Sequence, residues 1–547
     1  MNEYPRTLPE LLQRSIDAHA SDTALITQDE RWTYEELTEK IDQCSRSLIA
    51  GGVGKGTRLG LLMENSPEWV VLLFAATGLG AVLVAISTFS RRDDLAYQLK
   101  HADVEQLFLS KRFLKNDYAE ALREIVPELQ AAEPGRIYSQ ALPALRRVVM
   151  KGEDSASGGV ESWQDFEAGA DTVPAELVGA LRSEVDPEDE CYLLYTSGTT
   201  SRPKGVLHVH EGVARNGWMI GEYQKLDADD VVWFYYPMFF SAGCINVSLG
   251  TLSHGGSLIL QPSFVPGEAL ELIERERATT WHIWPHQLKS LMEHPDWKTR
   301  DHSHLHKGTG ALESMIKGGP DSDIGGVNMF GMTETCTAFT CTYGDEPVAV
   351  RRKTQGHVMP GNSIKIVDAD TGERLPTGEQ GEICVAGPSV LRRYYKVDPA
   401  ETFDAEGFFH TGDLGWLDED ERLHFMQRIK DMIKSGGINI SPAEVESKLV
   451  KIDGVEAAYA FPMPSADRGE VVGAALVVAG DEALTGDTIE AYCKDELAGY
   501  KRPAGVLILQ ADQVPMTGSG KVQKVVLRDR LMAEMEAQSG AIVRLVN

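Results

Sequence analysis

The segment from Trp69 to Thr88, WVVLLFAATGLGAVLVAIST, constrains the fold more than any other part of the chain. It contains no charged residue and approaches the length of a membrane-spanning helix. Gly78 and Gly80 divide it into a helix-like half and a β-branched half, AVLVAIST. A buried helix followed by a buried parallel strand explains this division better than a membrane span does. We therefore predict an α/β protein without a membrane span.

The same alternation of helices and short apolar strands extends from about Thr33 to Ser110, and strands recur near Cys191 and Val327. A chain of 547 residues exceeds the size of one compact core. Near Gln427 the sequence becomes more charged and is typical of a small α+β unit. We expect a large multi-layer N-terminal domain, with sheets, helices and a small β subdomain, followed by a small α+β C-terminal domain.

The charge of the chain is strongly negative. Lys and Arg total 53 against 82 Asp and Glu, a formal net charge of −29, and no long basic run is present. Nucleic acid is therefore not expected as a partner, because phosphate backbones bind to concentrated positive charge. The seven cysteines form no CxxC pair, and the N-terminus lacks the apolar core of a signal peptide. A cytoplasmic location is expected.

A glycine- and hydroxyl-rich loop follows a predicted strand, Cys191 to Tyr195, in the stretch LLYTSGTTSRPKGVLHVH at 193–210. Glycines allow a tight backbone whose N–H groups converge on an anion, and hydroxyls and a lysine add donors. The loop is not a Walker P-loop, because the order G-x-x-x-x-G-K-[ST] is absent. By itself it fits a solvated turn equally well. The candidate phosphate-binding residues are Thr196, Ser197, Gly198, Thr199, Thr200 and Lys204.

Four further motifs give the loop its context: FGMTET at 330–335, HTGDLG at 410–415, RIKDMIKSGGINISPAEVE at 428–446 and PMTGSGKVQK at 515–524. In this order the chain resembles the adenylate-forming superfamily, which includes AMP-forming acyl-CoA synthetases, peptide-synthetase adenylation domains and beetle luciferases. The resemblance implies an N-terminal domain at 1–429, which holds the ATP and acyl pockets, and a mobile C-terminal domain at 430–547.

The resemblance also implies an activity. An acid–thiol ligase of this kind converts a carboxylic acid and ATP to an acyl-adenylate and pyrophosphate, then transfers the acyl group to coenzyme A and releases AMP. ATP, Mg²⁺ and coenzyme A are the implied cofactors and cosubstrates, and a homodimer is compatible with the resemblance. Three alternatives stay open: acyl loading of a carrier protein, oxidation of the adenylate, and a non-catalytic nucleotide-binding module.

Charge neutralisation explains the implied catalytic residues, because a carboxylate is a poor nucleophile toward an anionic triphosphate. Glu334 is the implied Mg²⁺ ligand, and Thr333 is expected near the α-phosphate. A surface acid at a helix start would explain Glu334 without the resemblance. Lys521 resembles the family lysine that reaches the substrate carboxylate and the α-phosphate.

The remaining implied nucleotide contacts involve the base and the ribose. Phe330 is expected against the adenine ring, with the backbone of Gly310 and Ala311 on the other face, and Asn328 near the exocyclic amine. Gly331 and Met332 continue the same segment. Asp413 is expected to accept the ribose hydroxyls together with Arg428.

The C-terminal domain is expected to rotate between the two half-reactions. Lys430 occupies the family's hinge position. Rotation would bring Ser435, Gly436 and Gly437 alongside a tunnel for pantetheine, where a side chain would fill the passage.

The stretch YPMFFSAG at 236–243 indicates the class of acid substrate. Amino-acid-activating relatives have aspartate at the position of Phe240, and many acyl-CoA synthetases have histidine there. Phe240 therefore disfavours amino acids and favours a hydrophobic acid that is aliphatic, aromatic or alicyclic. The expected acyl pocket includes Phe239, Trp284 and Phe339, and His282 is expected to hydrogen-bond a ring substituent.

Overall fold

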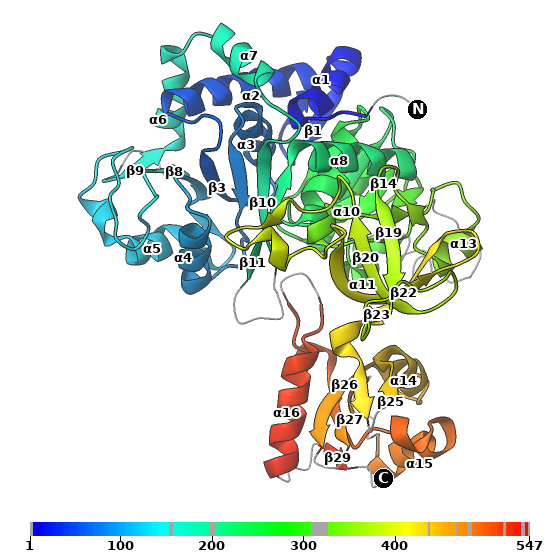
Figure 1. The fold of residues 1–547 in the computed structure, drawn as a ribbon. Coiled ribbons are helices and arrows are strands. Elements are labelled where there is room, and N and C mark those ends of the chain that lie inside the picture. Colours follow the sequence, from blue (N-terminus) through cyan, green and yellow to red (C-terminus); the bar gives the residue numbers. More distant parts are fainter. Residues whose placement is uncertain are drawn as a thin grey trace. The chain divides into compact units, whose positions relative to one another are not determined.

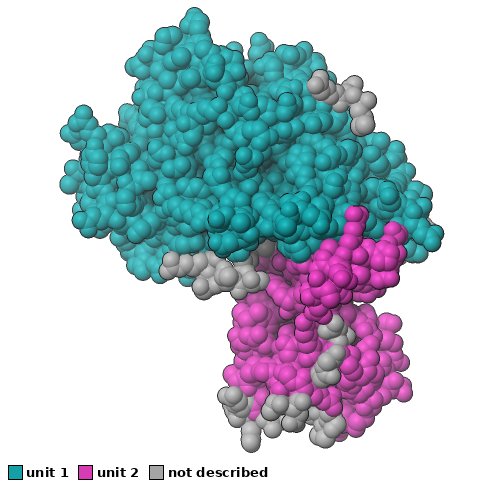
Figure 2. All heavy atoms as spheres, viewed as in Figure 1, with its two compact units in different colours: residues 1–365, 384–410, 417–424 teal, residues 366–383, 411–416, 425–547 magenta. Residues whose placement is uncertain are grey.

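The computed structural model describes residues 4–152, 157–196, 203–308, 326–435, 438–465, 468–478, 484–517, 521–537 and 542–544 (Figure 1). The chain divides into two compact units, which Figure 2 colours teal and magenta. Unit 1 comprises residues 1–365, 384–410 and 417–424, and unit 2 comprises residues 366–383, 411–416 and 425–547.

An eight-stranded sheet forms one half of unit 1. Its strands, in spatial order, are β21 (Arg393–Tyr394), β11 (Lys204–Val209), β10 (Glu190–Thr196), β4 (Val82–Ala85), β3 (Arg58–Leu62), β5 (Gln106–Ser110), β8 (Arg147–Lys151) and β9 (Val160–Ser162). The strands from β10 to β9 pair in parallel, whereas β11 pairs antiparallel with both β10 and β21. The β10–β11 hairpin therefore lies near the β21 edge of the sheet.

A six-stranded sheet forms the other half of unit 1. Its strands, in spatial order, are β15 (Lys307–Gly308), β14 (Thr280–His282), β12 (Val231–Phe234), β13 (Ser257–Leu260), β1 (Thr23–Ile26) and β2 (Arg31–Thr33). All neighbours are parallel except β1 and β2.

Helices cover both faces of each sheet. The main ones are α1 (Leu8–His19), α2 (Tyr34–Ala50), α3 (Pro67–Gly78), α4 (Arg92–His101), α5 (Tyr118–Ile125), α8 (His210–Gln224), α10 (Pro266–Arg275) and α11 (Pro285–Glu293). The largest core cluster joins α1, α2, α3 and α8 to strands of both sheets. Helices α4 and α5 pack on the other face of the eight-stranded sheet, and α10 and α11 on the other face of the six-stranded sheet. Unit 1 is thus a helix–sheet–helix–sheet–helix arrangement.

Side-chain alternation along β10 shows how the sequence builds these layers. Tyr192 and Leu194 face the central helices, whereas Leu193 faces the core on the α4 side. A strand that is apolar on both faces must be covered by helices on both sides. The continuous apolar run in the sequence has this physical origin.

The predicted division of Trp69 to Thr88 is confirmed. Helix α3 ends at Gly78, and β4 follows as a parallel strand between β3 and β10. Every residue from Trp69 to Ile86 is buried. Across the described residues, no helix combines the length and the apolar character that a membrane crossing requires.

Shorter elements complete unit 1. These are α6 (Trp163–Ala168), α7 (Glu176–Ser183), α9 (Gly250–Leu252), α13 (Val348–Lys353), β6 (Arg112–Phe113) and β7 (Asn116–Asp117), with a three-stranded sheet of β16 (Met329–Phe330), β17 (Thr340–Cys341) and β18 (His357–Val358). A four-stranded sheet of β19 (Ser363–Val367), β20 (Gly381–Ala386), β22 (Phe409–Leu417) and β23 (Leu423–Arg428) contributes residues to both units.

The C-terminal part of unit 2 is a sheet covered by helices on two faces. Its strands run in the order β25 (Ile438–Ile440), β24 (Ile433–Ser435), β27 (Gly469–Val478), β28 (Gly505–Leu509) and β29 (Ile542–Arg544), with β26 (Val455–Ser465) also paired to β27. Helices α14 (Pro442–Leu449) and α15 (Gly486–Glu496) cover one face, and α16 (Lys524–Ala537) covers the other. The prediction of a mixed α/β protein with a large N-terminal and a small C-terminal part is confirmed.

Candidate functional site

The β10–β11 hairpin positions the predicted phosphate loop. Thr196 and Lys204 are cross-strand partners at the end where the loop connects the two strands, so the loop begins and ends at a paired position. Ser197, Gly198, Thr199 and Thr200 lie outside the described residues.

Tyr394 connects the hairpin to the FGMTET motif. The Lys204 ammonium lies 4.5 Å from the centre of the Tyr394 ring, and the Tyr394 hydroxyl donates to Glu334 Oε1 at 2.9 Å. The structure therefore brings Lys204 and Glu334 together around one aromatic side chain. No sequence motif identified Tyr394 as a site residue.

The FGMTET motif forms a strand end followed by a tight turn. Phe330 ends β16, and a short 3₁₀ helix spans Thr333–Thr335. Cys336 and Thr337 then adopt positive φ angles of 50° and 80°. Non-glycine residues in this region carry backbone strain that the surroundings must support, and such strain is common at functional sites.

Two buried side chains hold this turn. Asn216 Nδ2 on α8 donates to the carbonyls of Cys336, at 2.6 Å, and Ala338, at 2.8 Å. His208 Nε2 on β11 donates to the Thr333 carbonyl at 2.8 Å, and the Cys336 thiol lies 3.2 Å from His208 Nδ1. Burial lowers the pKa of His208 to about 4, so the imidazole is neutral at pH 7. A neutral ring offers the donor and the acceptor that these contacts need.

His208 and Asn216 were not predicted as site residues either. The alternation of β11 offered one signal, since His208 falls on the same strand face as Lys204. Asn216 is a fully buried asparagine, which nothing in the helical pattern of α8 indicates.

The residues expected at the adenine are only partly described. Phe330 is buried, and Asn328 Nδ2 donates to the Thr354 carbonyl at 2.9 Å. Gly331 and Met332 follow Phe330 directly, and the Met332 N–H donates to Thr335 Oγ1 at 3.0 Å. Gly310 and Ala311 lie outside the described residues.

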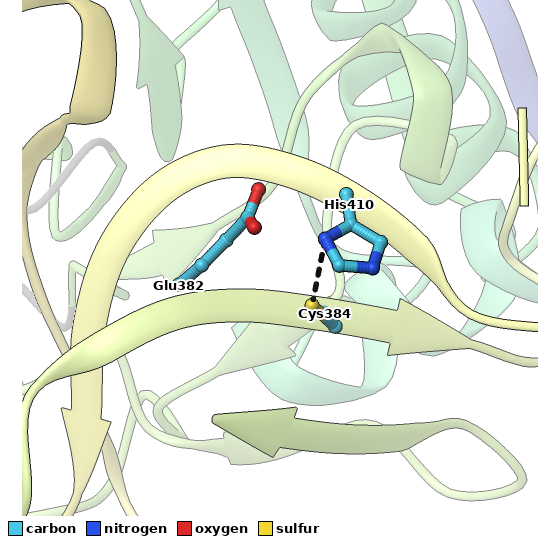
Figure 3. Close-up of side chains that lie close together, drawn as sticks. All are labelled: Glu382, Cys384 and His410. Carbon is cyan, nitrogen blue, oxygen red and sulfur yellow. Dashed lines mark hydrogen bonds between the residues drawn. The ribbon is translucent and has the colours of Figure 1, made fainter. Parts of the chain in front are cut away.

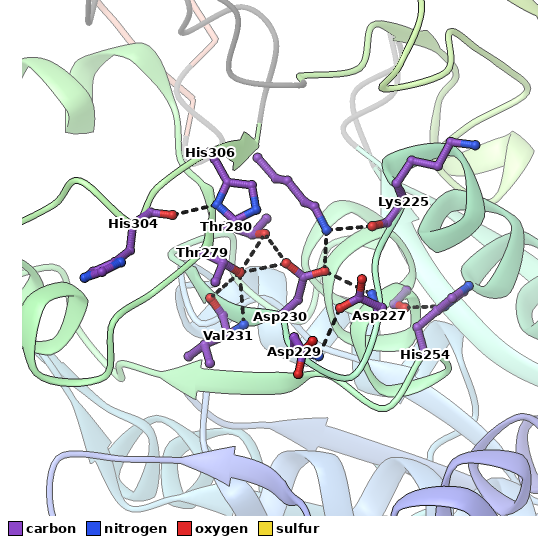
Figure 4. Close-up of polar contacts among 12 residues, drawn as sticks. Lys225, Asp227, Asp229, Asp230, Val231, His254, Thr279, Thr280, His304 and His306 are labelled. Atoms are coloured by element: carbon purple, nitrogen blue, oxygen red, sulfur yellow. Dashed lines mark hydrogen bonds and ion pairs between the residues drawn. The ribbon is translucent and has the colours of Figure 1, made fainter.

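A partly buried ion pair anchors β15, the strand that precedes Gly310 and Ala311 in the sequence. Asp230 accepts from Thr279 Oγ1 at 2.7 Å and pairs with Lys307 Nζ at 2.7 Å (Figure 4). Lys307 Nζ also donates to the Lys225 carbonyl at 2.6 Å. The first residue of β15 is thereby fixed to the end of α8 and to β12.

Unit 2 brings the two predicted ribose residues together. Asp413 is buried in β22, and Arg428 Nε lies 3.2 Å from its Oδ1. Thr411 Oγ1 accepts the Asp413 N–H at 3.1 Å, which orders the turn before the carboxylate. The ribose role of this pair stays a prediction.

The hinge, tunnel and lysine-loop residues also lie in unit 2. Lys430 is exposed within a 3₁₀ turn, Ile429–Asp431, and Ser435 ends β24. Gly436 and Gly437 lie outside the described residues. Lys521 is exposed, and its N–H donates to Thr517 Oγ1 at 3.0 Å.

Aromatic rings gather where the acyl pocket is expected. The rings of Phe239 and Phe240 lie 4.5 Å apart, and Phe89 lies 5.4 Å from Phe239 and 6.5 Å from Phe240. Phe239 is buried, Phe240 is partly exposed and Phe89 is 43% exposed. A π-helix, Ala242–Leu249, begins directly after this group. Helical segments of this type are rare and occur frequently at functional sites.

The other expected pocket residues differ in their exposure. Trp284 is partly exposed, and its ring lies 5.2 Å from that of Tyr236. His282 is buried in β14, and this burial lowers its pKa to about 4. Phe339 is fully buried, and its place in the acyl pocket stays a prediction.

A thiol–imidazole pair in unit 1 includes His410, the first residue of the HTGDLG motif. Cys384 Sγ on β20 lies 3.4 Å from His410 Nδ1 in a hydrogen bond (Figure 3). Glu382, two residues earlier on β20, accepts the Gly412 N–H at 3.0 Å. We assign these groups to hydrogen bonding near the strand ends.

The chain matches known families along most of its length. The AMP-binding enzyme family matches residues 12–395, and the AMP-binding enzyme C-terminal domain matches residues 444–521. The chain belongs to the AMP-binding enzyme family.

Individual relatives agree with this assignment. The AMP-binding enzyme is similar to YngI of Bacillus subtilis, named as an acyl-CoA synthetase, with 32% identity over 537 residues that cover 96% of this chain and 97% of the relative. It is 31% identical, over 97% of its length and 99% of the relative, to the 3-[(3aS,4S,7aS)-7a-methyl-1,5-dioxo-octahydro-1H-inden-4-yl]propanoyl:CoA ligase of Rhodococcus jostii. ATP-bound MatB from Rhodopseudomonas palustris superimposes with a TM-score of 0.80 at 27% identity, covering 95% of this chain and 98% of MatB.

These findings confirm the predicted enzyme class. The AMP-binding enzyme is an AMP-forming carboxylate–CoA ligase of the adenylate-forming superfamily. ATP and coenzyme A are its small-molecule substrates.

Proposed function

We propose that this ligase activates a hydrophobic carboxylic acid that is aliphatic, aromatic or alicyclic. The proposal rests on the contact group of Phe89, Phe239 and Phe240. Phe240 stands where amino-acid-activating relatives have the aspartate that holds the amino group of the substrate. An apolar acyl group loses contact with water against such rings. The similarity to a ligase named for a bicyclic propanoyl group supports the alicyclic part of the class.

The acyl group passes through an acyl-adenylate in this proposal. The substrate carboxylate attacks the α-phosphorus of ATP, and the bond to pyrophosphate breaks. Lys204 neutralises charge on the departing pyrophosphate, the hydroxyls of the phosphate loop donate hydrogen bonds to it, and Lys521 stabilises the charge that develops at the α-phosphate. The thiol of coenzyme A then attacks the acyl carbon and displaces AMP.

Glu334 fits the Mg²⁺ that this chemistry requires. Its Oε1 accepts the Tyr394 hydroxyl, and within the described part of the chain its Oε2 accepts no hydrogen bond. A partly exposed carboxylate oxygen is the kind of ligand that Mg²⁺ prefers. Bound there with the substrate phosphates, Mg²⁺ would neutralise their charge.

A substrate panel tests the proposed acid class. We expect release of AMP and pyrophosphate with aliphatic, aromatic and polycyclic acids, and an increase in turnover when coenzyme A is added. Amino acids serve as the matched control, and we expect at least tenfold lower kcat/KM for phenylalanine than for 3-phenylpropanoate, because nothing at Phe240 compensates the buried ammonium. Equal kcat/KM values for the two acids would contradict the proposal. Pyrophosphate release at the same rate with and without coenzyme A would indicate a carrier protein as the acyl acceptor.

We further propose that residues 430–547 rotate about Lys430 between the half-reactions. Lys430→Pro is expected to lower thioester formation at least tenfold more than adenylation, because proline fixes φ and restricts the preceding residue. The measurement compares ATP–pyrophosphate exchange with acyl-CoA formation. Lys430→Ala, which removes the same side chain without fixing the backbone, is expected to change both rates equally. Equal loss of both half-reactions in the proline variant would exclude the hinge.

A further inference from the structure

Tyr394 occupies a fixed place at the edge of the eight-stranded sheet. It is the cross-strand partner of Val206, two residues along β11 from Lys204. Backbone hydrogen bonds flank it on both sides, from the Arg392 N–H to the Leu207 carbonyl and from the Tyr395 N–H to the Gly205 carbonyl, each at 2.7 Å. The backbone pairing therefore fixes the position of Tyr394 along β11, the strand that begins with Lys204.

The same short segment is bonded to the FGMTET motif. The Leu391 N–H donates to the Glu334 carbonyl at 2.7 Å, and the Tyr394 hydroxyl donates to the Glu334 carboxylate at 2.9 Å. Glu334 is thus held by its main chain and by its side chain. Phe409 packs against the Tyr394 ring in an edge arrangement with the ring centres 6.3 Å apart, which restricts the ring's rotamer.

Tyr394 separates two opposite charges that would otherwise attract each other. In the described residues, Lys204 and Glu334 form no ion pair, because the lysine lies over the ring and the carboxylate lies at the hydroxyl. A direct pair would neutralise the charges that phosphate and cation require. A neutral aromatic side chain holds both groups close and leaves each charge available.

We propose that Tyr394 is a positioning residue for adenylation. Its ring holds the Lys204 ammonium in place, and its hydroxyl orients the Glu334 carboxylate. This inference rests on the proposed function, in which Lys204 faces phosphate and Glu334 faces the cation. It assigns two separable tasks to one side chain, and the ring and the hydroxyl can be removed one at a time.

Tyr394→Phe tests the hydroxyl. The variant keeps the ring and loses a hydrogen bond to a charged group, so we expect ATP–pyrophosphate exchange to fall about tenfold. The Mn²⁺ affinity of the ATP-bound protein, measured by electron paramagnetic resonance titration without acid, is expected to fall about threefold. Thermal melting checks that the variant is folded. Exchange and Mn²⁺ affinity equal to those of the wild type would overturn the proposal.

Tyr394→Leu tests the ring. It removes both contacts, and Lys204 loses its contact with the ring. ATP binding, measured by calorimetry without acid, is therefore expected to be about fivefold weaker than in the Phe variant. ATP affinity equal to that of the Phe variant would overturn the role assigned to the ring.

A double-mutant cycle distinguishes positioning from general support. If Tyr394 acts through Glu334, Tyr394→Phe has no further effect on exchange in a Glu334→Gln protein. Multiplicative effects would overturn the proposal.

Tyr395→Phe is the matched control. This neighbouring hydroxyl also donates to a carboxylate, Asp103 at 2.9 Å, away from the motif. Its loss is expected to leave exchange within twofold of the wild type. The wild-type acid panel separates this inference from the proposed function: failure of acid-dependent turnover refutes the function, whereas an active wild type with an unaffected Phe variant refutes only the role of Tyr394.

Discussion

Lys521→Ala is expected to slow acyl-adenylate formation by about a thousandfold while ATP binding stays within about twofold. The reason is that the contact is made chiefly in the transition state, where charge moves onto the α-phosphate oxygens. The structure holds this lysine by its backbone: its N–H donates to Thr517 Oγ1 at 3.0 Å, and its carbonyl accepts the Thr517 N–H at 2.7 Å. ATP–pyrophosphate exchange measures the rate, and calorimetry measures binding.

Two comparisons make the result specific to this side chain. Lys451→Ala removes another exposed lysine of unit 2, and we expect exchange within twofold of the wild type. With chemically prepared acyl-adenylate, Lys521→Ala is expected to form the thioester at a rate close to that of the wild type, because the second half-reaction does not use this lysine. Full exchange activity in Lys521→Ala would remove Lys521 from the proposed mechanism.

Gly331→Ala is expected to lower ATP–pyrophosphate exchange at least a hundredfold. A Cβ at this position would lie 2.0 Å from the Thr337 carbonyl oxygen and 2.7 Å from Ala338 Cα, both backbone atoms that cannot rotate away. The Phe330 carbonyl accepts the Phe339 N–H at 2.8 Å across the same turn, so relief of the clash must displace Phe330 or Glu334. Overpacking of this kind costs about 1–3 kcal/mol, so the melting temperature should also fall by a few degrees.

A second glycine provides the control for this prediction. Gly179→Ala makes the same chemical change in α7, where nothing lies within 4 Å of the added Cβ. We expect unchanged exchange and unchanged or slightly higher stability, since alanine favours a helix over glycine. Equal behaviour of the two variants would show that the motif turn can relax without moving its functional residues.

The pattern of apolar residues predicted the layered fold, because a buried helix or strand requires apolar side chains at consecutive positions. The apolar run that ends in AVLVAIST identified α3 and β4, and the strand from Cys191 placed the phosphate loop after a strand. The resemblance supplied Glu334, Asp413, Arg428 and Lys521, whose roles stay predictions. The place of Phe339 in the acyl pocket also stays a prediction, and its side chain is fully buried.

By itself, the sequence determined the α/β class and the order of the motifs, because these depend on residue type and on short spacing. The ligase activity was an expectation from the resemblance of these motifs to the adenylate-forming superfamily. Only the tertiary structure decided which side chains hold the motifs in place. Tyr394 meets Lys204 and Glu334 because β21 joins the sheet beside β11, and Asn216 meets Cys336 because α8 passes behind the motif turn. Such contacts join residues that are distant in the chain. They depend on sheet pairing and helix packing, which the periodicity of a local segment does not predict.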